Sequence, residues 1–482
     1  MDIIFANPII NKTKIVATVG PASRDRETLK GLIAAGVDVF RLNFSHGSHA
    51  DHLETTERIL SINKEQNTNV AILADLQGPK IRLGQMENGP VPIAEGEQIV
   101  FSTENILGTT KKVPIVYETF AKDVKVGEPI KVDDGKLEFR VTEILNDKEV
   151  LLTTISGGEL KDRKGVNMPF SNLSVPSMTE KDFADLEYIL TLPVNWIALS
   201  FVRTAEEINN LKKLIEKKKH PARVIAKIEK PEAVENIDSI IESTHAIMVA
   251  RGDLGVEIPV EDVPSVQKMI VTKCIAASKP VIIATQMMES MIEDTIPSRA
   301  EITDVANAIY DGTDAVMLSG ETAMGKHPIK VVETMQRIIA RTEQDERIYN
   351  VPHSIDTTKQ KHITNAMIST AVNMAKEVNA AGILGMTRTG YTGFKLSSFR
   401  PKSPIFVFTD NPKLLNMFSL LWGIRAFFYD QHKSKVDKGI ADVQELLKEK
   451  KLIKKGDWVV NTGSMPIEER GPTNFVKVTQ IK

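Results

Sequence analysis

The sequence predicts an α/β protein organised around a closed barrel of eight parallel strands, each followed by a helix, the (β/α)8 fold. Short apolar runs of strand length alternate with amphipathic segments of helix length between residues 14 and 342, eight times in all. Polar side chains stand at the end of every one of these runs. An open, doubly wound sheet is the alternative fold. The barrel is favoured because it brings the ends of all its strands to one rim.

Three strand–helix units come before a change of pattern. We expect strands at Lys14–Gly20, Val37–Phe44 and Val70–Leu76, with helices at Asp25–Ala35 and Ala50–Gln66. From about Ile81 to Ser174 the residues then alternate with period two, and glycine and Asp-Gly turns interrupt the alternation. Residues 80–176 are therefore predicted to form an all-β lid domain, inserted after the third strand.

Five further units complete the barrel, which is assigned to residues 12–79 and 177–348. The first opens with a helix, because Thr179 to Asp182 resemble a capping box. The strands are expected at Trp196–Phe201, Val224–Ile228, Ala246–Ala250, Val281–Thr285 and Ala315–Leu318. The remaining helices are expected at Ala205–Lys218, Glu232–Ser243, Val263–Ala277, Arg299–Tyr310 and Ile329–Thr342.

A second α/β region follows a polar linker around Asn350–Lys361. Five strand-length apolar runs alternate there with helical segments, which predicts a separate C-terminal α/β sandwich over residues 360–482. These runs are Gly382–Met386, Ile405–Phe408, Arg425–Phe428, Trp458–Asn461 and Asn474–Val478.

The composition is that of an ordinary globular chain, with 42% hydrophobic and 26% charged residues. The net charge of −2 gives no basic field that would favour nucleic acid or an anionic membrane as a partner. Cys274 is the single cysteine, so the chain has no internal disulfide. We expect a cytoplasmic protein, because we find neither a secretory signal nor an apolar run long enough to span a bilayer.

The segment from Val224 to Gly255 predicts a metal site. It reads as strand, helix and strand, and the two strands lead into Lys227 with Glu229 and into Arg251 with Asp253. Charges at the end of a buried strand are costly unless they meet a partner, a metal or a substrate. Glu229 and Asp253 would lie side by side, as hard oxygen ligands suited to Mg²⁺, with Mn²⁺ as a substitute.

The other strands add further residues to the same predicted rim, all of them polar except Pro21. These residues are Thr18, Pro21, Arg41, Asn43, Ser45, His46, Asp75, Ser200, Thr285, Gln286, Ser319 and Glu321. Cationic side chains among or near them, from Arg41, Arg82 and Lys227, indicate phosphate oxygens in the substrate. Paired carboxylates and several cations favour phosphoryl transfer, which depends on positioning and charge neutralisation. The GxGxxG and Walker A motifs are absent, so a nucleotide would have to bind at the rim itself.

At the level of motifs, the chain resembles the pyruvate kinase family. The matching stretches are KIVATVGPAS (14–23), RLNFSHG (41–47), ADLQGPKIR (74–82), KGVNMP (164–169), AKIEKPE (226–232), ARGDLGVE (250–257), ATQMMESM (284–291) and MLSGETAMGKHP (317–328). They cover the barrel and the insert in family order. The resemblance implies transfer of a phosphoryl group from phosphoenolpyruvate to ADP, giving pyruvate and ATP.

The resemblance also implies a role for each matching residue. Glu229 and Asp253 would hold Mg²⁺, Lys227 would stabilise the phosphoryl group, and Arg41 would bind its oxygens. The backbone N–H groups of Ala250, Arg251 and Gly252 would bind the substrate carboxylate. Thr285 would act in protonation of the enolate, together with Ser319 and Glu321. Arg82 and Lys164 would reach the nucleotide phosphates, and Asn43, His46 and Pro21 complete the implied nucleotide site.

One departure from the family concerns a monovalent cation, usually potassium. The resemblance assigns this cation to Asn43, Ser45, Asp75 and the carbonyl of Leu76. Potassium-dependent members carry glutamate where this chain has Lys80. We therefore expect the Lys80 ammonium to replace the cation and activity to persist without added potassium.

The second departure lies in the C-terminal domain. Thr387, Thr389, Gly390 and Thr392 match the family's phosphate-binding loop, which implies a phosphorylated effector. Glu468 and Glu469 put negative charge in the opposing loop, where Arg470 alone offsets it, so we expect a monophosphate in preference to a bisphosphate. The alternative is a domain kept only for subunit contacts. The resemblance also implies a homotetramer.

Two other functions compete with this interpretation. A mutase or lyase acting on phosphoenolpyruvate or oxaloacetate would need no lid over a nucleotide, so Arg82 and Lys164 argue against it. A catalytically silent metabolite sensor would gain nothing from keeping Lys227, Glu229, Asp253 and Thr285 together.

Overall fold

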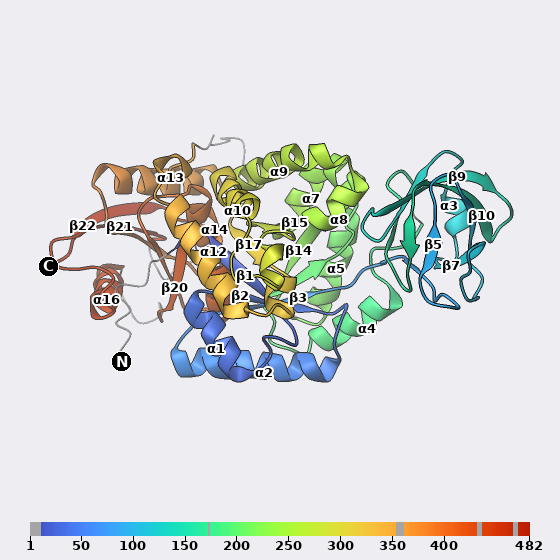
Figure 1. Cartoon of the computed structure of the whole chain (residues 1–482). Helices are drawn as coiled ribbons and strands as arrows, with labels where there is room; N and C mark the ends of the chain where they lie inside the picture. The colour runs from blue at the N-terminus through green and yellow to red at the C-terminus, as the bar shows by residue number, and fades with distance from the viewer. Residues whose placement is uncertain (1–10, 172–173, 353–360, 431–435, 466–470) are drawn as a thin grey trace.

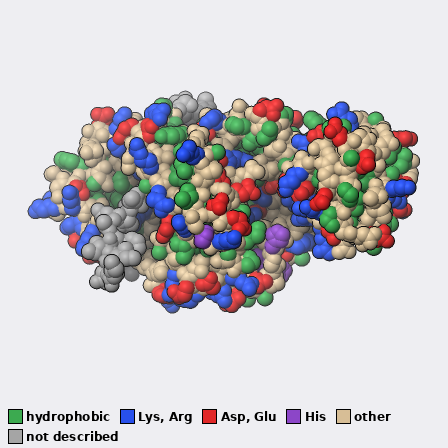
Figure 2. Space-filling model, viewed as in Figure 1, with side chains coloured by type: hydrophobic (Ala, Val, Ile, Leu, Met, Phe, Trp, Pro, Cys, Tyr) green, Lys and Arg blue, Asp and Glu red, His purple; other side chains and the backbone are tan. Residues whose placement is uncertain are grey.

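The computed structural model describes residues 11–171, 174–352, 361–430, 436–465 and 471–482. The chain forms three bodies in a row, with the barrel between the lid and the C-terminal domain (Figure 1). In the space-filling view the lid stands out from the barrel as a separate lobe, and acidic and basic side chains are interspersed over the visible face (Figure 2). Among the described residues, none of the helices has the length and apolar character needed to cross a membrane.

Eight parallel strands close the barrel, as predicted. They are β1 (Lys14–Val19), β2 (Val39–Asn43), β3 (Ala71–Asp75), β13 (Trp196–Leu199), β14 (Arg223–Ile228), β15 (Ala246–Ala250), β16 (Val281–Ala284) and β17 (Ala315–Leu318). Closure is made by β1, which pairs with β2 on one side and with β17 on the other. The predicted fold class is therefore confirmed.

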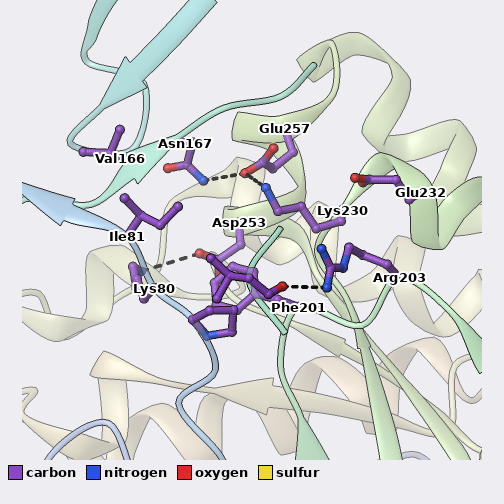
Figure 3. A pocket seen from close by; sticks show the side chains of 12 residues that line it. Lys80, Ile81, Val166, Asn167, Phe201, Arg203, Lys230, Glu232, Asp253 and Glu257 are labelled. Atoms are coloured by element: carbon purple, nitrogen blue, oxygen red, sulfur yellow. Dashed lines mark hydrogen bonds and ion pairs between the residues drawn. The ribbon is translucent and has the colours of Figure 1, made fainter. Parts of the chain in front are cut away.

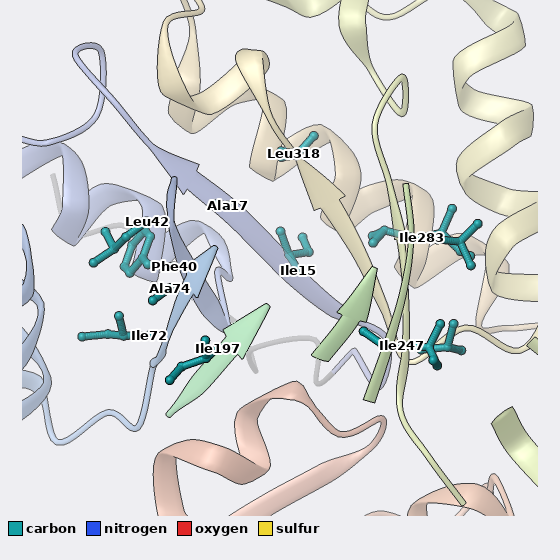
Figure 4. Packing of buried hydrophobic residues seen from close by; sticks show 14 of the residues in the cluster. Ile15, Ala17, Phe40, Leu42, Ile72, Ala74, Ile197, Ile247, Ile283 and Leu318 are labelled. Carbon is teal, nitrogen blue, oxygen red and sulfur yellow. The ribbon is translucent and has the colours of Figure 1, made fainter. Parts of the chain in front are cut away.

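Apolar side chains point to both sides of the barrel strands. Those that point outward, such as Ile15, Phe40, Ile72 and Ile197, are buried in a large cluster beneath the surrounding helices (Figure 4). Strands buried on both faces explain why the sequence shows continuous apolar runs at these positions.

The barrel helices begin where the sequence supplies caps. They are α1 (Arg26–Ala35), α2 (His49–Gln66), α4 (Glu180–Ile189), α5 (Ala205–Lys217), α6 (Pro231–Glu235), α7 (Ile237–Ser243), α8 (Arg251–Glu257), α9 (Val263–Ala277), α10 (Arg299–Asp311), α11 (Gly320–Ala323) and α12 (Pro328–Thr342). Thr179 and Asp182 form the expected capping box before α4. Ser48 and Asp51 form another capping box before α2.

Two helices differ from the sequence-based expectation. The segment Glu232–Ser243 is divided into α6 and α7, because the backbone at Asn236 turns out of the helical region and its side-chain amide donates to the Arg203 carbonyl. The short helix α8 follows β15 directly, although the two glycines in its sequence argue against a helix. The consequence is that Asp253 lies in the first turn of a helix and not on an extended strand end.

The described part of the lid forms a seven-stranded sheet and a two-stranded sheet. Its elements are β4 (Arg82–Leu83), β5 (Val91–Ile93), β6 (Gln98–Ser102), β7 (Lys112–Val116), α3 (Phe120–Asp123), β8 (Pro129–Val132), β9 (Leu137–Ile144), β10 (Glu149–Ser156), β11 (Gly158–Leu160) and β12 (Val166–Asn167). Its apolar side chains, Phe101, Phe120 and Phe139 among them, form a cluster of their own.

In its described residues, the C-terminal domain is built on a five-stranded sheet in the order β20-β19-β18-β21-β22. Its elements are α13 (His362–Glu377), β18 (Gly382–Met386), α14 (Tyr391–Ser398), β19 (Ile405–Thr409), α15 (Pro412–Met417), β20 (Ile424–Phe428), α16 (Val436–Glu449), β21 (Trp458–Gly463) and β22 (Phe475–Gln480). The strands run parallel except for β22, which is antiparallel to β21.

Candidate active site

Lys227 connects the ends of three neighbouring strands, β3, β13 and β14, at the barrel rim. It comes from the end of β14, and its Nζ is 2.7 Å from Ser200 Oγ, 2.9 Å from Glu229 Oε1 and 3.4 Å from Asp75 Oδ1. Burial disfavours the charged form of this lysine, but the carboxylates of Asp75 and Glu229 outweigh burial and raise its pKa. Lys227 is therefore a fixed cation at physiological pH.

Arg41 adds a second cation beside Lys227. Its Nε is 2.6 Å from Asp75 Oδ2, and one of its terminal nitrogens donates to Thr18 Oγ1 at 3.0 Å. Burial disfavours the Asp75 carboxylate, yet the charges of Lys227 and Arg41 lower its pKa. Asp75 thus remains ionised between two cations and fixes both of them on the rim.

Glu229 and Asp253 form the acidic part of the site. Glu229 Oε2 accepts the backbone N–H of Phe201 at 2.7 Å. Burial, together with repulsion from Asp253, raises the pKa of Glu229 although Lys227 acts in the opposite direction. Two neighbouring carboxylates that repel each other in a partly buried site are a donor set that suits a divalent cation.

Thr285 and Arg251 lie where β16 and α8 meet. Thr285 has a left-handed backbone with φ of 68°, and its Oγ1 accepts the N–H of Gly252 at 2.8 Å while donating to the Ala284 carbonyl. The Arg251 side chain donates to Asp304 Oδ1 at 2.7 Å and to the Thr285 carbonyl at 2.8 Å. Arg251 therefore anchors the start of α8, which leaves only its backbone for the predicted carboxylate contact.

Glu321 is buried behind the rim at the start of α11. Its carboxylate accepts the N–H of Ser319 at 2.7 Å and that of Met288 at 3.2 Å. Burial raises its pKa above the usual range for glutamate. A carboxyl group with a raised pKa beside Ser319 can hold a proton at this end of the barrel.

The cationic residues predicted for the nucleotide belong to the lid. Lys164 Nζ is 2.8 Å from Asp133 Oδ1, and Arg82 donates to the Arg163 carbonyl at 3.0 Å. Both are partly exposed, as is Asn43, whereas His46 and Pro21 are exposed at the barrel rim.

The residues predicted for a monovalent cation have protein donors as partners. Asn43 Oδ1 accepts the N–H of Ser45 at 3.1 Å, and the Leu76 carbonyl accepts the Ser200 hydroxyl at 2.7 Å. Asp75 faces Arg41 and Lys227. Lys80 lies on the Asp253 side of the site, with Nζ 3.6 Å from Asp253 Oδ1 (Figure 3).

Sequence reasoning missed a polar cluster between the barrel and the lid. Lys230 and Asn167 each donate a hydrogen bond to Glu257, and Lys80, Arg203 and Asp253 line the same pocket (Figure 3). The only available signal was the charge on Lys230 next to Glu229. Its partners lie in other elements.

The predicted effector loop forms the start of α14. Gly390 has φ of 89° and its N–H donates to Thr387 Oγ1 at 3.0 Å, while Thr392 Oγ1 lies 2.9 Å from Thr473 Oγ1. The Thr389 carbonyl lies 3.4 Å from an Arg223 nitrogen of the barrel. Glu468, Glu469 and Arg470 lie outside the described residues.

Comparison with known proteins identifies the family. The family model for the pyruvate kinase barrel domain matches residues 10–332, and that for the pyruvate kinase alpha/beta domain matches residues 365–479. A pyruvate kinase from Geobacillus stearothermophilus is 42% identical over 98% of this chain and 80% of its own length. One from Mycobacterium intracellulare is 40% identical over 97% of this chain and 98% of its own length.

A solved structure gives the same result at the level of the fold. The crystal structure of a pyruvate kinase from Cryptosporidium parvum superposes with a TM-score of 0.91 and 34% identity, covering 98% of this chain and 96% of the other. The chain belongs to the pyruvate kinase family, the phosphotransferases that convert phosphoenolpyruvate and ADP to pyruvate and ATP.

Proposed function

We propose that the rim around Lys227 performs the family reaction, with this lysine stabilising the phosphoryl group during its transfer. The observation that carries the proposal is the buried ammonium, held at the rim by Asp75, Glu229 and Ser200. A fixed cation acts most strongly on charge that develops in the transition state. Arg41, oriented by Asp75, would bind phosphate oxygens beside it.

Glu229 and Asp253 would hold Mg²⁺, or Mn²⁺ in its place, in keeping with the general use of Mg²⁺ by this family. The mutual repulsion of the two carboxylates supports this assignment. A divalent cation bound there supplies positive charge to the oxygens of the substrate and of the transferring group.

The substrate carboxylate would be bound by backbone N–H groups of Ala250, Arg251 and Gly252. Because the Gly252 N–H donates to Thr285 Oγ1, the carboxylate would take over this donor and release the Thr285 hydroxyl. A freed hydroxyl is then available near the carbon that gains a proton. Glu321 and Ser319 would extend the proton path, and the raised pKa of Glu321 suits a group that holds a proton.

The lid would complete the nucleotide site with Arg82 and Lys164, facing Asn43, His46 and Pro21 on the rim. Closure of a lid excludes water from the transferring phosphoryl group, which would otherwise be lost to hydrolysis. Lys164 now pairs with Asp133, and its ammonium is partly exposed, so a phosphate group can reach it and compete with the carboxylate.

The substitution Lys227→Met tests the central assignment. We expect kcat to fall by roughly 10²–10³-fold, because the lost charge acts mainly on the transition state, whereas Mn²⁺ affinity changes less. Pyruvate release from phosphoenolpyruvate and ADP measures the effect. Lys213→Met, at an exposed position of α5, is the control. Wild-type turnover in Lys227→Met would refute the assignment. Absence of turnover in the folded parent protein would favour the silent sensor.

Potassium independence remains our expectation for this chain, although the family generally uses K⁺. Support comes from the Lys80 ammonium, which lies 3.6 Å from Asp253 and contributes positive charge to the site without a bound ion. Activity should persist in tetramethylammonium buffer, and Lys80→Glu should make the enzyme depend on added potassium. A loss of wild-type activity to a few per cent without potassium would contradict this expectation.

A monophosphate effector at Thr387–Thr392 and a homotetramer in the cytoplasm stay predictions from the family resemblance. The contact of Thr389 with Arg223 supports the effector proposal in one respect. Arg223 begins β14, the strand that ends near Lys227, so the two sites share one strand.

A further inference from the structure

The lid contacts the barrel through one edge of its larger sheet. Asn167 of β12 and Lys131 of β8 face each other across the two antiparallel strands. Asn167 Nδ2 donates to Glu257 Oε1 at 2.8 Å, and Lys131 Nζ donates to the Val256 carbonyl at 2.8 Å. Neighbouring lid residues thus bind neighbouring residues at the end of α8. An ammonium group is favoured there, because the last carbonyls of a helix carry partial negative charge.

Glu257 connects this edge of the lid to the segment that follows β14. Its Oε1 also accepts a hydrogen bond from Lys230 Nζ at 2.8 Å, and the side chains of Glu257 and Lys230 are 1% and 8% exposed. Its Oε2 is buried and has no hydrogen-bond partner within the described part of the chain. The carboxylate is therefore positioned by two donors: Asn167 of the lid, and Lys230, which directly follows Glu229 in the barrel.

The helix α8 carries both Glu257 and Asp253. The two residues are four positions apart, which is about one helical turn, so their side chains lie on the same face of the helix. Lys80 and Asp253 lie next to the Lys230–Glu257–Asn167 cluster in the same pocket (Figure 3). A displacement of Glu257 along or around the helix axis would therefore displace Asp253 as well.

We propose that Glu257 is a positioning residue. It links the contact between the lid edge and the end of α8 to the placement of Asp253. When Asn167 and Lys131 bind the end of α8, the helix holds Asp253 in its metal-binding position. When the lid edge leaves, Glu257 keeps only Lys230 and the helix loses two of its anchors. This inference rests on the proposed function in one respect, the role of Asp253 as a metal ligand.

The test uses the full-length double variant Lys131→Met/Asn167→Ala, which removes both lid donors and leaves Glu257, Lys230 and Asp253 intact. Lys125→Met is the matched control, because Lys125 is an exposed lid lysine. Two spin labels are placed on cysteines introduced at exposed Lys148 of the lid and exposed Lys217 of the barrel. The native Cys274 is buried and does not compete for the label.

The first readout is the distribution of distances between the two labels, and the second is the affinity of the unlabelled protein for Mn²⁺. We expect the double variant to show a broader distance distribution than the parent and Lys125→Met. We also expect about tenfold weaker Mn²⁺ binding, the lower end of what loss of an outer-shell partner costs a metal site. Lys131→Met alone should show both changes to a smaller extent. This single variant replaces the double variant in the test if the double variant fails to fold.

An unchanged distance distribution would show that Asn167 and Lys131 do not hold the lid against α8. A broadened distribution with an unchanged Mn²⁺ affinity would show that this contact does not affect Asp253. A parent protein that binds no Mn²⁺ would contradict the metal assignment of the proposed function and, with it, the link. The distances between the labels can be measured without metal and without turnover. They therefore test the contact between lid and α8 separately from the proposed function.

Discussion

The barrel is joined to its two neighbours in opposite ways. The lid has its own apolar core, whose residues all lie between Ile81 and Val175, and it contacts the barrel through polar groups such as Asn167 and Lys131. The C-terminal domain instead shares one apolar cluster with the interior of the barrel, in which Leu73 and Trp196 belong with C-terminal residues such as Phe418.

Charged groups reinforce the difference. Arg400 of the C-terminal domain is 1% exposed and binds both carboxylate oxygens of Asp314, at 3.0 and 2.9 Å. Opening this junction would expose apolar surface at about 25 cal/mol per Å² and leave a buried ion pair without its environment. The polar lid contacts can exchange for water at small cost. The lid is therefore suited to move, whereas the C-terminal domain is fixed to the barrel.

The largest effect is expected from breaking the fixed junction with Arg400→Met. Removal of one partner from a buried ion pair leaves Asp314 buried and uncompensated, so the free energy of unfolding should fall by about 3–5 kcal/mol. Urea unfolding measures the change. The control is Lys402→Met, whose ion pair with Glu346 is exposed on both sides. Equal effects of the two substitutions would contradict the difference between the junctions.

A pH effect at the same junction is expected from Lys12. Its Nζ donates to the Pro401 carbonyl and lies over the rings of Tyr349 and Trp422, and burial lowers its pKa to about 7. Between pH 7 and the ordinary lysine pKa, the unfolded chain holds a proton that the folded chain has released. The stability should therefore rise with pH in this window, by at most about 1.4 kcal/mol per pH unit.

The comparison of the wild type with Lys12→Met isolates this contribution, because all other titrating groups are common to both proteins. Urea unfolding at several pH values from 7 to 9 provides the measurement. The wild type should gain stability relative to the variant as the pH rises. A constant difference across this range would show that Lys12 does not titrate there.

The smallest effect on stability is expected from Asn167→Ala at the lid junction. One hydrogen bond to the buried Glu257 carboxylate is lost, but Asn167 itself is partly exposed and water can take its place. The free energy of unfolding should therefore fall by about 1.5 kcal/mol, the lower end for a hydrogen bond to a charged group. The same urea titration measures it beside Arg400→Met. A loss as large as that of Arg400→Met would mean that the lid junction is as much a part of the fold as the C-terminal one.

Much of the fold could be predicted because the signals are local. The eight barrel strands are short apolar runs, and the structure has them within about two residues of their predicted ends. The helix α8 was missed, because its Arg-Gly-Asp-Leu-Gly sequence has poor intrinsic helix propensity and the neighbouring strand and helices stabilise it.

The candidate site was predictable only where a single charged residue at the end of a buried strand indicates a functional site by itself. Lys227 lies near the end of the buried strand β14 and Glu229 follows it, so their charges alone indicated a site. The Asn167–Glu257–Lys230 cluster joins residues 90 and 27 positions apart, and no local pattern specifies which of many charged residues will meet. The Arg251 side chain likewise binds Asp304, a partner 53 positions away.

The separate core of the lid has a consequence for how such a protein can change over generations. The described buried apolar residues of the lid pack in a cluster of their own, so substitutions among them need no compensation in the barrel. The whole lid could also be replaced by another domain at the two points where the chain passes between barrel and lid, provided that the edge contacting α8 is kept. The C-terminal domain has no such freedom, because a change at Phe418 is also a change to the floor of the barrel.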